Sequence, residues 1–428
     1  MLVVAAGATF LALLDTTVAN LAVAEVAADF GASTSAATWM ITIYAVTFSA
    51  FLAPAGRLAD LVGRRTLLLA GVSLFALFSL ACAVAPSLET LFVARALQGA
   101  GAAAMIPASL AVVLADTAPE RRAAAIGAWS AAGAFAAAVG PALGGVLVDG
   151  SGWRALFVIN LPVGLAILAG ARVIPRGAAG GRVPDVLGTL LLGAGIGAAA
   201  LGIAQGEDWG WGDPRTLAAL AGAVVATGAA LRRSFTHATP ALETGLWRSR
   251  RFASANVASL LYGAALFPWL LVGVLFLVTV WGYSALEAGL AMTPGAVVAA
   301  GVALAASRRN PRPAVIGGAL VLALAGAICV AALPADPSFL TFWLPVGVLI
   351  GAGTGAIATG ISTAAALSVP PERFAAAVGL NQTARLLGGA LGVAALAALV
   401  GTDVASFKDV YLFCTLATLG VAVLGRRL

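Results

Sequence analysis

Long apolar stretches separated by short polar loops dominate the sequence. Most of these stretches lack charged residues, and their length is close to the about 20 residues that an α-helix needs to cross the hydrocarbon core of a bilayer. The pattern therefore predicts fourteen transmembrane helices. The predicted spans are residues 2–24, 36–55, 66–85, 91–114, 123–148, 154–174, 186–204, 216–231, 254–280, 286–306, 314–333, 340–366, 374–400 and 410–425.

The distribution of basic residues among the loops tests this count, because successive loops must alternate between the two sides of the membrane. With the N-terminus in the cytoplasm, nineteen of the 24 Lys and Arg residues fall on the cytoplasmic side and three fall outside. The other two, Arg95 and Arg385, lie within spans. The asymmetry predicts a multi-pass protein of the cytoplasmic membrane with both termini in the cytoplasm.

Composition excludes a soluble globular protein. Only 10% of the 428 residues are charged and 61% are hydrophobic, whereas roughly 25% of residues are charged in soluble domains. The net charge of +6 arises from the cytoplasmic loops and does not form a stripe that would bind nucleic acid. The loops are too short for a catalytic domain, and no phosphate-binding loop, HExxH or GxSxG motif occurs. We therefore expect no enzymatic activity, cofactor, metal, nucleotide or nucleic-acid partner.

The two longest cytoplasmic segments, about 175–185 and 232–253, flank one pair of spans. They divide the chain into six helices, two helices and six helices. We therefore predict an all-α polytopic membrane protein with an N-terminal six-helix bundle over residues 1–175, an inserted helix pair with its loops over 176–250, and a C-terminal six-helix bundle over 251–428.

One cytoplasmic loop carries a recognisable motif. The string GRLADLVGRR resembles the signature of the major facilitator superfamily, with Gly56, Asp60, Gly63, Arg64 and Arg65 at the family's positions. Glycines permit a tight turn between antiparallel helices, and Asp60 can accept hydrogen bonds from an arginine or from a helix N-terminus. The loop therefore predicts a conformational latch that stabilises one access state; the alternative is a turn that only follows the topology.

Further strings resemble the fourteen-span drug:proton antiporters of EmrB/QacA type. LLDTTVAN at 13–20, RALQGAGAA at 95–103 and GPALGG at 140–145 resemble signatures of the first, fourth and fifth helices. The chain departs from the family at Ala24 and Glu25, where the first-helix signature usually has proline. The resemblance implies the major facilitator fold and export of lipophilic small molecules in exchange for protons.

Asp15 is the only carboxylate deep within a predicted span. A charge at mid-bilayer costs roughly 2.5 to 3.5 kcal/mol on insertion scales, so its presence calls for an explanation. Asp15 and Arg95 lie at depths that differ by about 3 Å at a rise of 1.5 Å per residue. If the first and fourth spans face each other, as the resemblance implies, the two can pair and then loosen when Asp15 is protonated. The alternative is a permanent salt bridge that only fixes helix register.

Several other residues within or beside the spans are candidates for the substrate pathway, because polar groups can bind a substrate and aromatic rings can hold a lipophilic cation. Gln98 lies one helical turn after Arg95. Arg385 has no acidic residue nearby in sequence and must find backbone carbonyls, water or an amide such as Asn381. The full set is Asn20, Tyr44, Gln98, Trp129, Phe135, Tyr262, Asn381 and Arg385. For any single aromatic residue, packing or anchoring is the alternative.

GPALGG predicts a close-packed bend in the fifth span. Gly140 and Gly144 form a small face, Pro141 removes a backbone donor, and Gly145 extends the face. We expect this bend to meet a neighbouring helix across the two halves of the protein. The alternative is ordinary glycine packing.

Together these observations predict a secondary transporter that exports drugs. Its expected partners are lipophilic small molecules, protons and the lipid bilayer, and it is expected to act as a monomer. A single deep carboxylate favours neutral or singly cationic substrates over dications. Two alternatives use the same fold. One is a proton-coupled nutrient symporter, and the other is a flippase or exporter of lipids or glycolipids.

Overall fold

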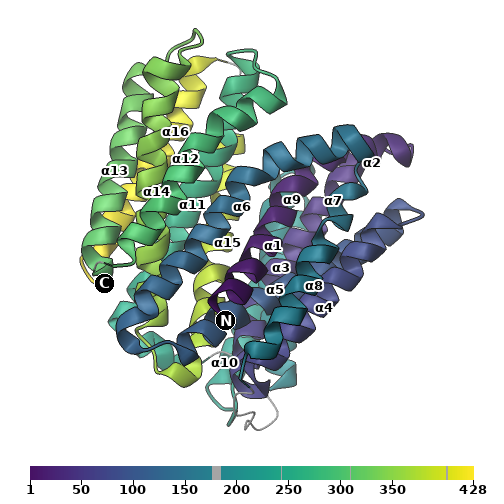
Figure 1. Cartoon of the computed structure of the whole chain (residues 1–428), viewed down its shortest axis with the longest axis vertical. Helices are drawn as coiled ribbons and strands as arrows, with labels where there is room; N and C mark the ends of the chain where they lie inside the picture. Colours follow the sequence, from purple (N-terminus) through teal and green to yellow (C-terminus); the bar gives the residue numbers. More distant parts are fainter. Residues whose placement is uncertain (176–184, 242, 309, 402) are drawn as a thin grey trace. The chain divides into compact units, whose positions relative to one another are not determined.

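Helices make up nearly all of the computed structural model, which is drawn in Figure 1. It describes residues 1–175, 185–241, 243–308, 310–401 and 403–428, without the side chains of Pro141, Ala142, Asp149, Glu207 and Ala285. The described part of the chain contains no β-strand. Fourteen of its helical segments are long and apolar enough to cross a membrane, which confirms the predicted number of spans.

The chain divides into two compact units. Unit 1 comprises Met1–Ala118, Val139–Leu246 and Val369–Leu380, and unit 2 comprises Pro119–Ala138, Trp247–Ser368 and Asn381–Leu428. Two helices contribute residues to both units, namely α6 (Arg122–Ser151) and α15 (Phe374–Leu399). The predicted domain boundaries near residues 175 and 250 stay predictions.

Unit 1 contains the helices of the first six predicted spans, except the first part of α6, together with the predicted helix pair. These elements are α1 (Leu2–Val18), the 3₁₀ turn η1 (Ala19–Ala22), α2 (Val23–Asp29), α3 (Thr34–Val62), α4 (Arg64–Ala83), α5 (Leu88–Asp116), α7 (Ala155–Val158), α8 (Asn160–Gly170), η3 (Ala171–Val173), α9 (Val186–Trp209) and α10 (Pro214–Ser234), with the short η6 (Pro371–Arg373) from later in the chain.

Two predicted spans are interrupted helices. The first runs through α1, η1 and α2 to Asp29, five residues beyond its predicted end. The sixth is divided between α7 and α8 at Ile159. Both breaks lie in apolar sequence, so hydropathy alone does not reveal them.

Helix α5 lies at the centre of unit 1. It packs against α1, α3 and α4, and its candidate span is the most buried of the fourteen. Helices α1 and α4 also contact α8. Side chains of α1, α4, α5 and α8 can therefore meet inside this unit, away from lipid.

The helix pair α9 and α10 forms a hairpin that packs on α3. Asp185 caps α9 by accepting from the backbone N–H of Gly188 at 3.0 Å, and it pairs with Arg233 near the end of α10 at 2.6 Å. Burial raises the pKa of Asp185, but the Gly188 N–H and the Arg233 guanidinium together outweigh it, so the pKa lies below its usual value. The ion pair therefore joins the cytoplasmic ends of the hairpin.

Unit 2 contains the first part of α6, the later part of α15 and five further long helices. Its elements include η2 (Pro119–Arg121), α11 (Arg250–Thr279), α12 (Ala285–Ala306), α13 (Pro311–Ala332), the π-helical η5 (Phe339–Trp343), α14 (Leu344–Ala366) and α16 (Val404–Gly425), and η4 (Thr244–Arg248) leads into it from unit 1. Helix α14 packs against α11, α12 and α13, while α16 packs against α11 and α13.

Glycines allow α14 to approach its neighbours closely. A Cβ at Gly351 would lie 2.0 Å from the carbonyl oxygen of Gly295 on α12, and one at Gly355 would lie 2.3 Å from that of Ala299. No side chain fits at such distances. The GAGTG string is therefore a packing surface of the kind expected between membrane helices.

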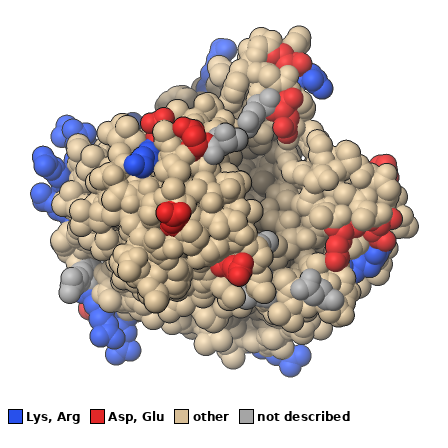
Figure 2. Space-filling model, turned by 90° about the horizontal axis from the view of Figure 1, so that it is seen from above, with Lys and Arg blue, Asp and Glu red and all other residues tan. Residues whose placement is uncertain are grey.

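Charged residues are sparse on the surface formed by the helix ends in Figure 2. Acidic groups are spread over this face, and basic groups lie mainly at its edge. The rest of the face is neither acidic nor basic. This distribution agrees with a protein in which most residues pack against each other or against lipid.

Candidate functional site

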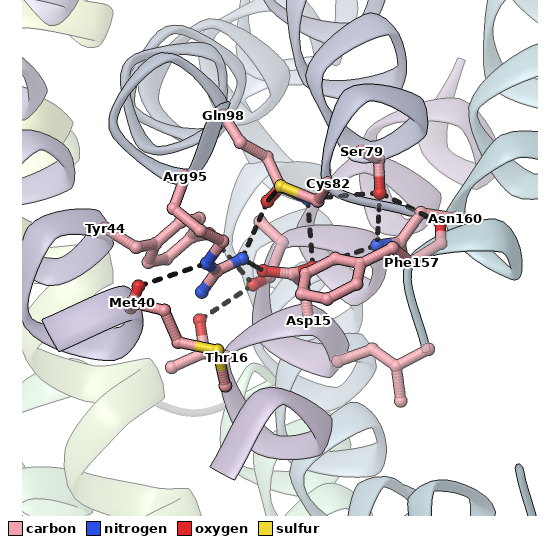
Figure 3. Close-up of polar contacts among 12 residues, drawn as sticks. Asp15, Thr16, Met40, Tyr44, Ser79, Cys82, Arg95, Gln98, Phe157 and Asn160 are labelled. Atoms are coloured by element: carbon pink, nitrogen blue, oxygen red, sulfur yellow. Dashed lines mark hydrogen bonds and ion pairs between the residues drawn. The ribbon is translucent and has the colours of Figure 1, made fainter. Parts of the chain in front are cut away.

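A buried ion pair joins α1 and α5 inside unit 1 (Figure 3). Arg95 Nη1 lies 2.6 Å from Asp15 Oδ2, and both residues are 0% exposed. The packing of α1 on α5 places the two charges at matching depth, as their positions in the predicted spans required. The structure thus brings together the two residues predicted to couple transport to protons. Their role in coupling stays a prediction.

The second oxygen of Asp15 is held by two amides. Asp15 Oδ1 accepts from Gln98 Nε2 at 3.0 Å and from Asn160 Nδ2 at 2.9 Å. Ser79 on α4 ties these amides together, because its Oγ accepts from both, at 3.2 and 2.9 Å. The same hydroxyl donates to the Phe157 carbonyl at 2.9 Å. Five elements of unit 1, namely α1, α4, α5, α7 and α8, therefore contribute to one hydrogen-bond network around a single carboxylate.

Arg95 is enclosed on its other sides. Its Nε donates to the Met40 carbonyl at 3.2 Å, and its Nη1 also donates to Gln98 Oε1 at 2.7 Å. The guanidinium carbon lies 4.1 Å from the ring centre of Tyr44, which is a favourable cation–π distance. Tyr44 thus covers Arg95 in this structure, although the sequence suggested it as a wall of the substrate pathway.

This arrangement suits an ionised carboxylate. An ionised carboxylate only accepts hydrogen bonds, and here every partner of Asp15 is a donor. A proton on Asp15 would remove the counter-ion of Arg95 and turn one acceptor into a donor that faces other donors. Since an unpaired buried charge costs several kcal/mol, the network would have to rearrange.

Sequence reasoning missed Asn160 and Ser79. Asn160 is the one amide in the apolar run 154–174, which is the signal that could have identified it. Ser79 lies in an apolar run where a hydroxyl usually bonds to its own helix, so its sequence context carried no comparable signal. Their importance follows from the packing of α8 and α4 on each other.

The other predicted pathway residues of the first six spans lie in different environments. Asn20 is exposed and donates to the Thr16 carbonyl of its own helix at 3.0 Å, so it does not join Asp15. On α6, Trp129 is buried at 3% exposure, whereas Phe135 is 50% exposed. Asn20 therefore lies in unit 1 apart from the ion pair, whereas Trp129 and Phe135 belong to unit 2.

The second arginine within a predicted span, Arg385, is partly buried and has a different setting within unit 2. Its Nη2 donates to Ser362 Oγ on α14 at 3.2 Å, and its guanidinium lies 5.3 Å from the ring centre of Tyr262 on α11. Asn381 instead donates to the Ala255 carbonyl at 3.4 Å. Among the described residues, no carboxylate pairs with Arg385, and its Nε has no hydrogen-bond partner.

The glycine face of α6 packs against the first span. A Cβ at Gly140 would lie 2.0 Å from Thr17 Oγ1, and one at Gly144 would lie 2.6 Å from Leu21 Cδ1. These neighbours belong to α1 and η1 of the same unit, and the predicted meeting with a helix of the other half stays a prediction. Gly145 has no neighbouring atom within 4 Å of such a Cβ, and the side chain of Pro141 lies outside the described residues.

The predicted latch residue Asp60 contacts the start of α15, and these residues all belong to unit 1. Asp60 accepts from the backbone N–H groups of Ala376 at 2.9 Å and Ala375 at 3.4 Å, where a helix N-terminus favours a negative charge. Arg64 donates to Asp60 at 3.0 Å and also to the Pro371 carbonyl. Both kinds of partner, an arginine and a helix N-terminus, were predicted for Asp60 from the sequence.

Two glycines make this geometry possible. Gly63 separates α3 from α4 with a φ of 102°, a conformation that L side chains rarely adopt. A Cβ at Gly56 would lie 2.4 Å from the Ala375 carbonyl oxygen, so glycine permits the close approach. Arg65 forms no hydrogen bond or ion pair with the described residues.

Glu243 adds a connection that sequence reasoning did not anticipate. It pairs with Arg57 at 2.5 Å and with Arg373 at 2.8 Å, and Arg57 Nε also donates to the Pro240 carbonyl at 3.2 Å. The segment after α10 is thereby tied to the same cytoplasmic region of unit 1 as Asp60. No local sequence signal marks this acid, because its two partners lie far away in the chain.

The fold and the ion pair define a class of protein, namely a polytopic helical membrane protein with a charged pair enclosed among its helices. Comparison with known proteins gives the family. Residues 5–393 match the Major Facilitator Superfamily, and the chain belongs to this family of transporters. It is accordingly a multi-pass membrane transporter, and its bacterial relatives place it in the cytoplasmic membrane.

Relatives with known roles match over most of their length. The puromycin resistance protein of Streptomyces alboniger is 37% identical over 92% of this chain and 80% of its own. The tetracenomycin C resistance and export protein of Streptomyces glaucescens is 33% identical, over 98% of this chain and 79% of its own. The cephamycin export protein of Amycolatopsis lactamdurans is 33% identical, over 99% and 91%.

A solved structure confirms the fold independently of close sequence similarity. The crystal structure of the human organic anion transporter MFSD10 (TETRAN) matches with a TM-score of 0.66 over 98% of both chains. The sequence identity is 16%, so the likeness concerns the fold alone. The predicted all-α major facilitator fold is therefore confirmed.

Proposed function

We propose that this transporter exports lipophilic small molecules in exchange for protons by alternating access. The observation that carries the proposal is the enclosed pair of Asp15 and Arg95, in which both oxygens of the carboxylate are occupied by donors. Further support comes from the relatives, which are named as antibiotic resistance or export proteins. Deep ionisable residues in a membrane helix are typical of proton relays and transport pathways.

In the proposed cycle, Asp15 binds a proton from the outside and its ion pair with Arg95 loosens. The network then rearranges and the transporter reorients, after which the proton leaves toward the cytoplasm as substrate binds. The return step carries the substrate outward. A driving force of about 150 mV supplies roughly 3.5 kcal/mol per proton, which is enough for a substrate gradient of a few hundredfold at one-to-one exchange.

The cytoplasmic contacts of Asp60 support the alternating part of the proposal. A carboxylate at the first turn of α15 stabilises the arrangement in which α3 and the start of α15 are close together. We propose that this contact forms in one access state and breaks in the other. The ion pairs of Glu243 with Arg57 and Arg373 would assist it.

Substrate-induced proton movement in everted membrane vesicles tests the proposal. The assay compares wild type with Asp15→Asn, using puromycin, tetracenomycin C, lipophilic cations and neutral antibiotics as probes. We expect wild type to release protons with at least one probe, and Asp15→Asn to bind that probe without releasing protons.

Asp29→Asn is the matched control. Asp29 lies in the same span and also pairs with an arginine, Arg154, at 2.7 Å, but both side chains are 42% exposed. We expect this variant to release protons as wild type does. Proton release that survives in Asp15→Asn, or a wild type that transports a probe without any proton movement, would contradict the proposal.

A further inference from the structure

The two arginines within the predicted spans, Arg95 and Arg385, differ in whether a carboxylate neutralises them; Arg95 is fully buried and Arg385 is partly buried. Arg95 has Asp15 at 2.6 Å. Arg385 has a serine hydroxyl and an aromatic ring, and its Nε has no partner among the described residues. A buried cation without an anion is costly, and sites of this kind in membrane proteins usually mark functional pathways.

Other polar groups without partners lie on α11 and α14, the two helices that the Arg385 side chain contacts. On α11, Asn256, Ser259 and Tyr262 recur every three residues and so share one face. The Asn256 Oδ1 and Ser259 Oγ atoms are buried and make no hydrogen bond, and the two residues are 2% and 0% exposed. The α11 face thus offers polar atoms that protein groups leave unused.

Helix α14 presents a second polar face. Thr359, Ser362 and Thr363 are spaced so that they lie on one side of the helix, and they are 1%, 6% and 3% exposed. The hydroxyls of Thr359 and Thr363 have no hydrogen-bond partner, although a threonine in a helix commonly bonds to a carbonyl of its own preceding turn. Both hydroxyl hydrogens are therefore free to be donated.

Specific contacts bring these faces to α15. Arg385 reaches Ser362 on α14 and lies against the Tyr262 ring on α11, while the Tyr262 hydroxyl donates to the Thr354 carbonyl at 3.1 Å. Close packing reinforces the arrangement, because a Cβ at Gly263 would lie 1.9 Å from the Arg385 carbonyl oxygen. Arg385 thus contacts one residue on each of the two helices that carry the hydroxyls without partners.

The structure assigns this cluster as the binding site for the anionic group of a lipophilic substrate, such as a carboxylate. A guanidinium binds a carboxylate through parallel N–H donors, and threonine hydroxyls can complete the hydrogen bonds of its oxygens. The inference rests on the proposed export function and specifies its substrate class. It also replaces the sequence-based preference for neutral or singly cationic substrates, because Asp15 is occupied by its own partners and cannot receive a cation while its network is intact.

A matched pair of probes tests the assignment. The full chain in phosphatidylcholine nanodiscs is titrated with 1-pyrenebutyrate and with its methyl ester, and binding is followed by pyrene fluorescence anisotropy. The probes share the lipophilic ring system and differ in charge. We expect wild type to bind the carboxylate at least tenfold more tightly than the ester, which corresponds to about 1.4 kcal/mol.

Variants test whether the preference for 1-pyrenebutyrate over its methyl ester depends on Arg385 and the hydroxyls of α14. Arg385→Gln should remove the tenfold difference, whereas Arg385→Lys should retain part of it because the charge remains without the planar fork. Thr359→Val keeps the volume and removes a hydroxyl, so it should reduce the preference by severalfold. This variant also keeps the assignment testable if Arg385→Gln fails to fold.

Arg251→Gln is the matched control, since Arg251 lies on α11 of the same unit and its Nε also lacks a partner, but at the predicted cytoplasmic end. It should leave the preference unchanged. Equal binding of both probes by wild type, or an unchanged preference in Arg385→Gln, would overturn the assignment.

Two further experiments distinguish a lipid ligand from a free anion, and the anion site from proton coupling. Nanodiscs that contain phosphatidylglycerol show whether an anionic lipid headgroup competes with 1-pyrenebutyrate, and competition that depends on Arg385 would support the anion site with a lipid as its source. Asp15→Asn should abolish proton release and keep the anion preference. The proposed proton coupling and the anion site can therefore fail separately.

Discussion

The two arginines within the membrane helices of this transporter, Arg95 and Arg385, show how differently one residue type can be used there. Arg95 in unit 1 has a counter-ion, a glutamine carbonyl, a backbone carbonyl and an aromatic ring. Arg385 in unit 2 has one serine hydroxyl and one ring. When every polar group of a network has a partner, as around Arg95, a proton that binds to the network forces it to rearrange. When hydrogen-bond donors are unused, as around Arg385, they can bind a ligand.

Removal of each arginine gives the largest expected contrast. Arg95→Gln leaves the Asp15 carboxylate buried without its counter-ion, and we expect the free energy of unfolding to fall by about 3–5 kcal/mol. Arg385→Gln removes a cation that no carboxylate neutralises, so the free energy of unfolding should stay within about 1 kcal/mol of wild type or rise. Chemical unfolding in mild detergent measures both.

The double variant Asp15→Asn/Arg95→Gln is the control for that contrast. It removes both charges together, so most of the lost stability should return although proton coupling is absent. Equal losses in Arg95→Gln and Arg385→Gln would show that the two arginines are equally well neutralised, and the distinction between them would fail.

The same contrast can be made with two buried serines. Ser79 makes three hydrogen bonds within the Asp15 network, whereas Ser259 makes none in the described structure. We expect Ser79→Ala to lower the free energy of unfolding by about 1–3 kcal/mol. Ser259→Ala should be neutral or stabilising, because it removes a buried hydroxyl that has no partner.

Thermal unfolding of the two serine variants under identical detergent conditions provides the comparison. The substitutions are chemically identical and both sites are 0% exposed. The interpretation would be contradicted if Ser259→Ala were the more destabilising of the two, since this would mean that Ser259 has a partner that matters for folding.

A substitution of Asp60 tests how much its contacts with Arg64 and α15 stabilise one access state. Asp60→Asn preserves shape but loses the charge that faces Arg64 and the first turn of α15, at a cost of about 1–2 kcal/mol. This should change the ratio of the two access states by about five- to thirtyfold. Alkylation of a cysteine introduced at Ala59, which is 0% exposed beside Asp60, measures the change in a background without the three native cysteines.

For this variant, Glu120→Gln serves as the control, because Glu120 is an exposed acid on the same predicted side of the membrane. Alkylation at Ala59→Cys should accelerate with Asp60→Asn and stay at its original rate with Glu120→Gln. A rate that is unaffected by Asp60→Asn would mean that the carboxylate does not hold a closed state.

Much of the fold could be predicted from the sequence, because a membrane span needs a long apolar segment and the cytoplasmic loops carry most of the basic residues. The number of spans follows from apolar length and from the sidedness of arginine, and the glycine string near Gly351 indicates close packing. The breaks at η1 and at Ile159 were missed, because apolar residues do not show by their hydropathy where a helix changes its hydrogen bonding.

The candidate site was predictable only where residues stand out in their own spans. Asp15 and Arg95 are charges in apolar runs, and their depths can be compared along two helices. The partners of Arg385 depend on which faces of α11 and α14 turn toward α15, and one sequence does not determine helix rotation.

The smallest expected effect concerns an ion pair outside the spans, that of Asp185 with Arg233. Asparagine also caps helices well, so Asp185→Asn loses mainly the ion pair, and we expect a loss of at most about 1 kcal/mol at neutral pH. Because the pKa of Asp185 is lowered in the folded state, this contribution is present above its ordinary value of 3.8. It disappears as the pH falls through the folded value.

Thermal unfolding of wild type and Asp185→Asn between about pH 8 and pH 3 checks the sign. The difference should be constant down to about pH 5 and should shrink below the ordinary carboxyl value. A difference that grows on acidification would mean that burial dominates and that folding favours the neutral acid. Asp185, which is 2% exposed, would then behave as a buried charge without adequate partners does, and its setting would resemble that of Arg385 more than that of Arg95.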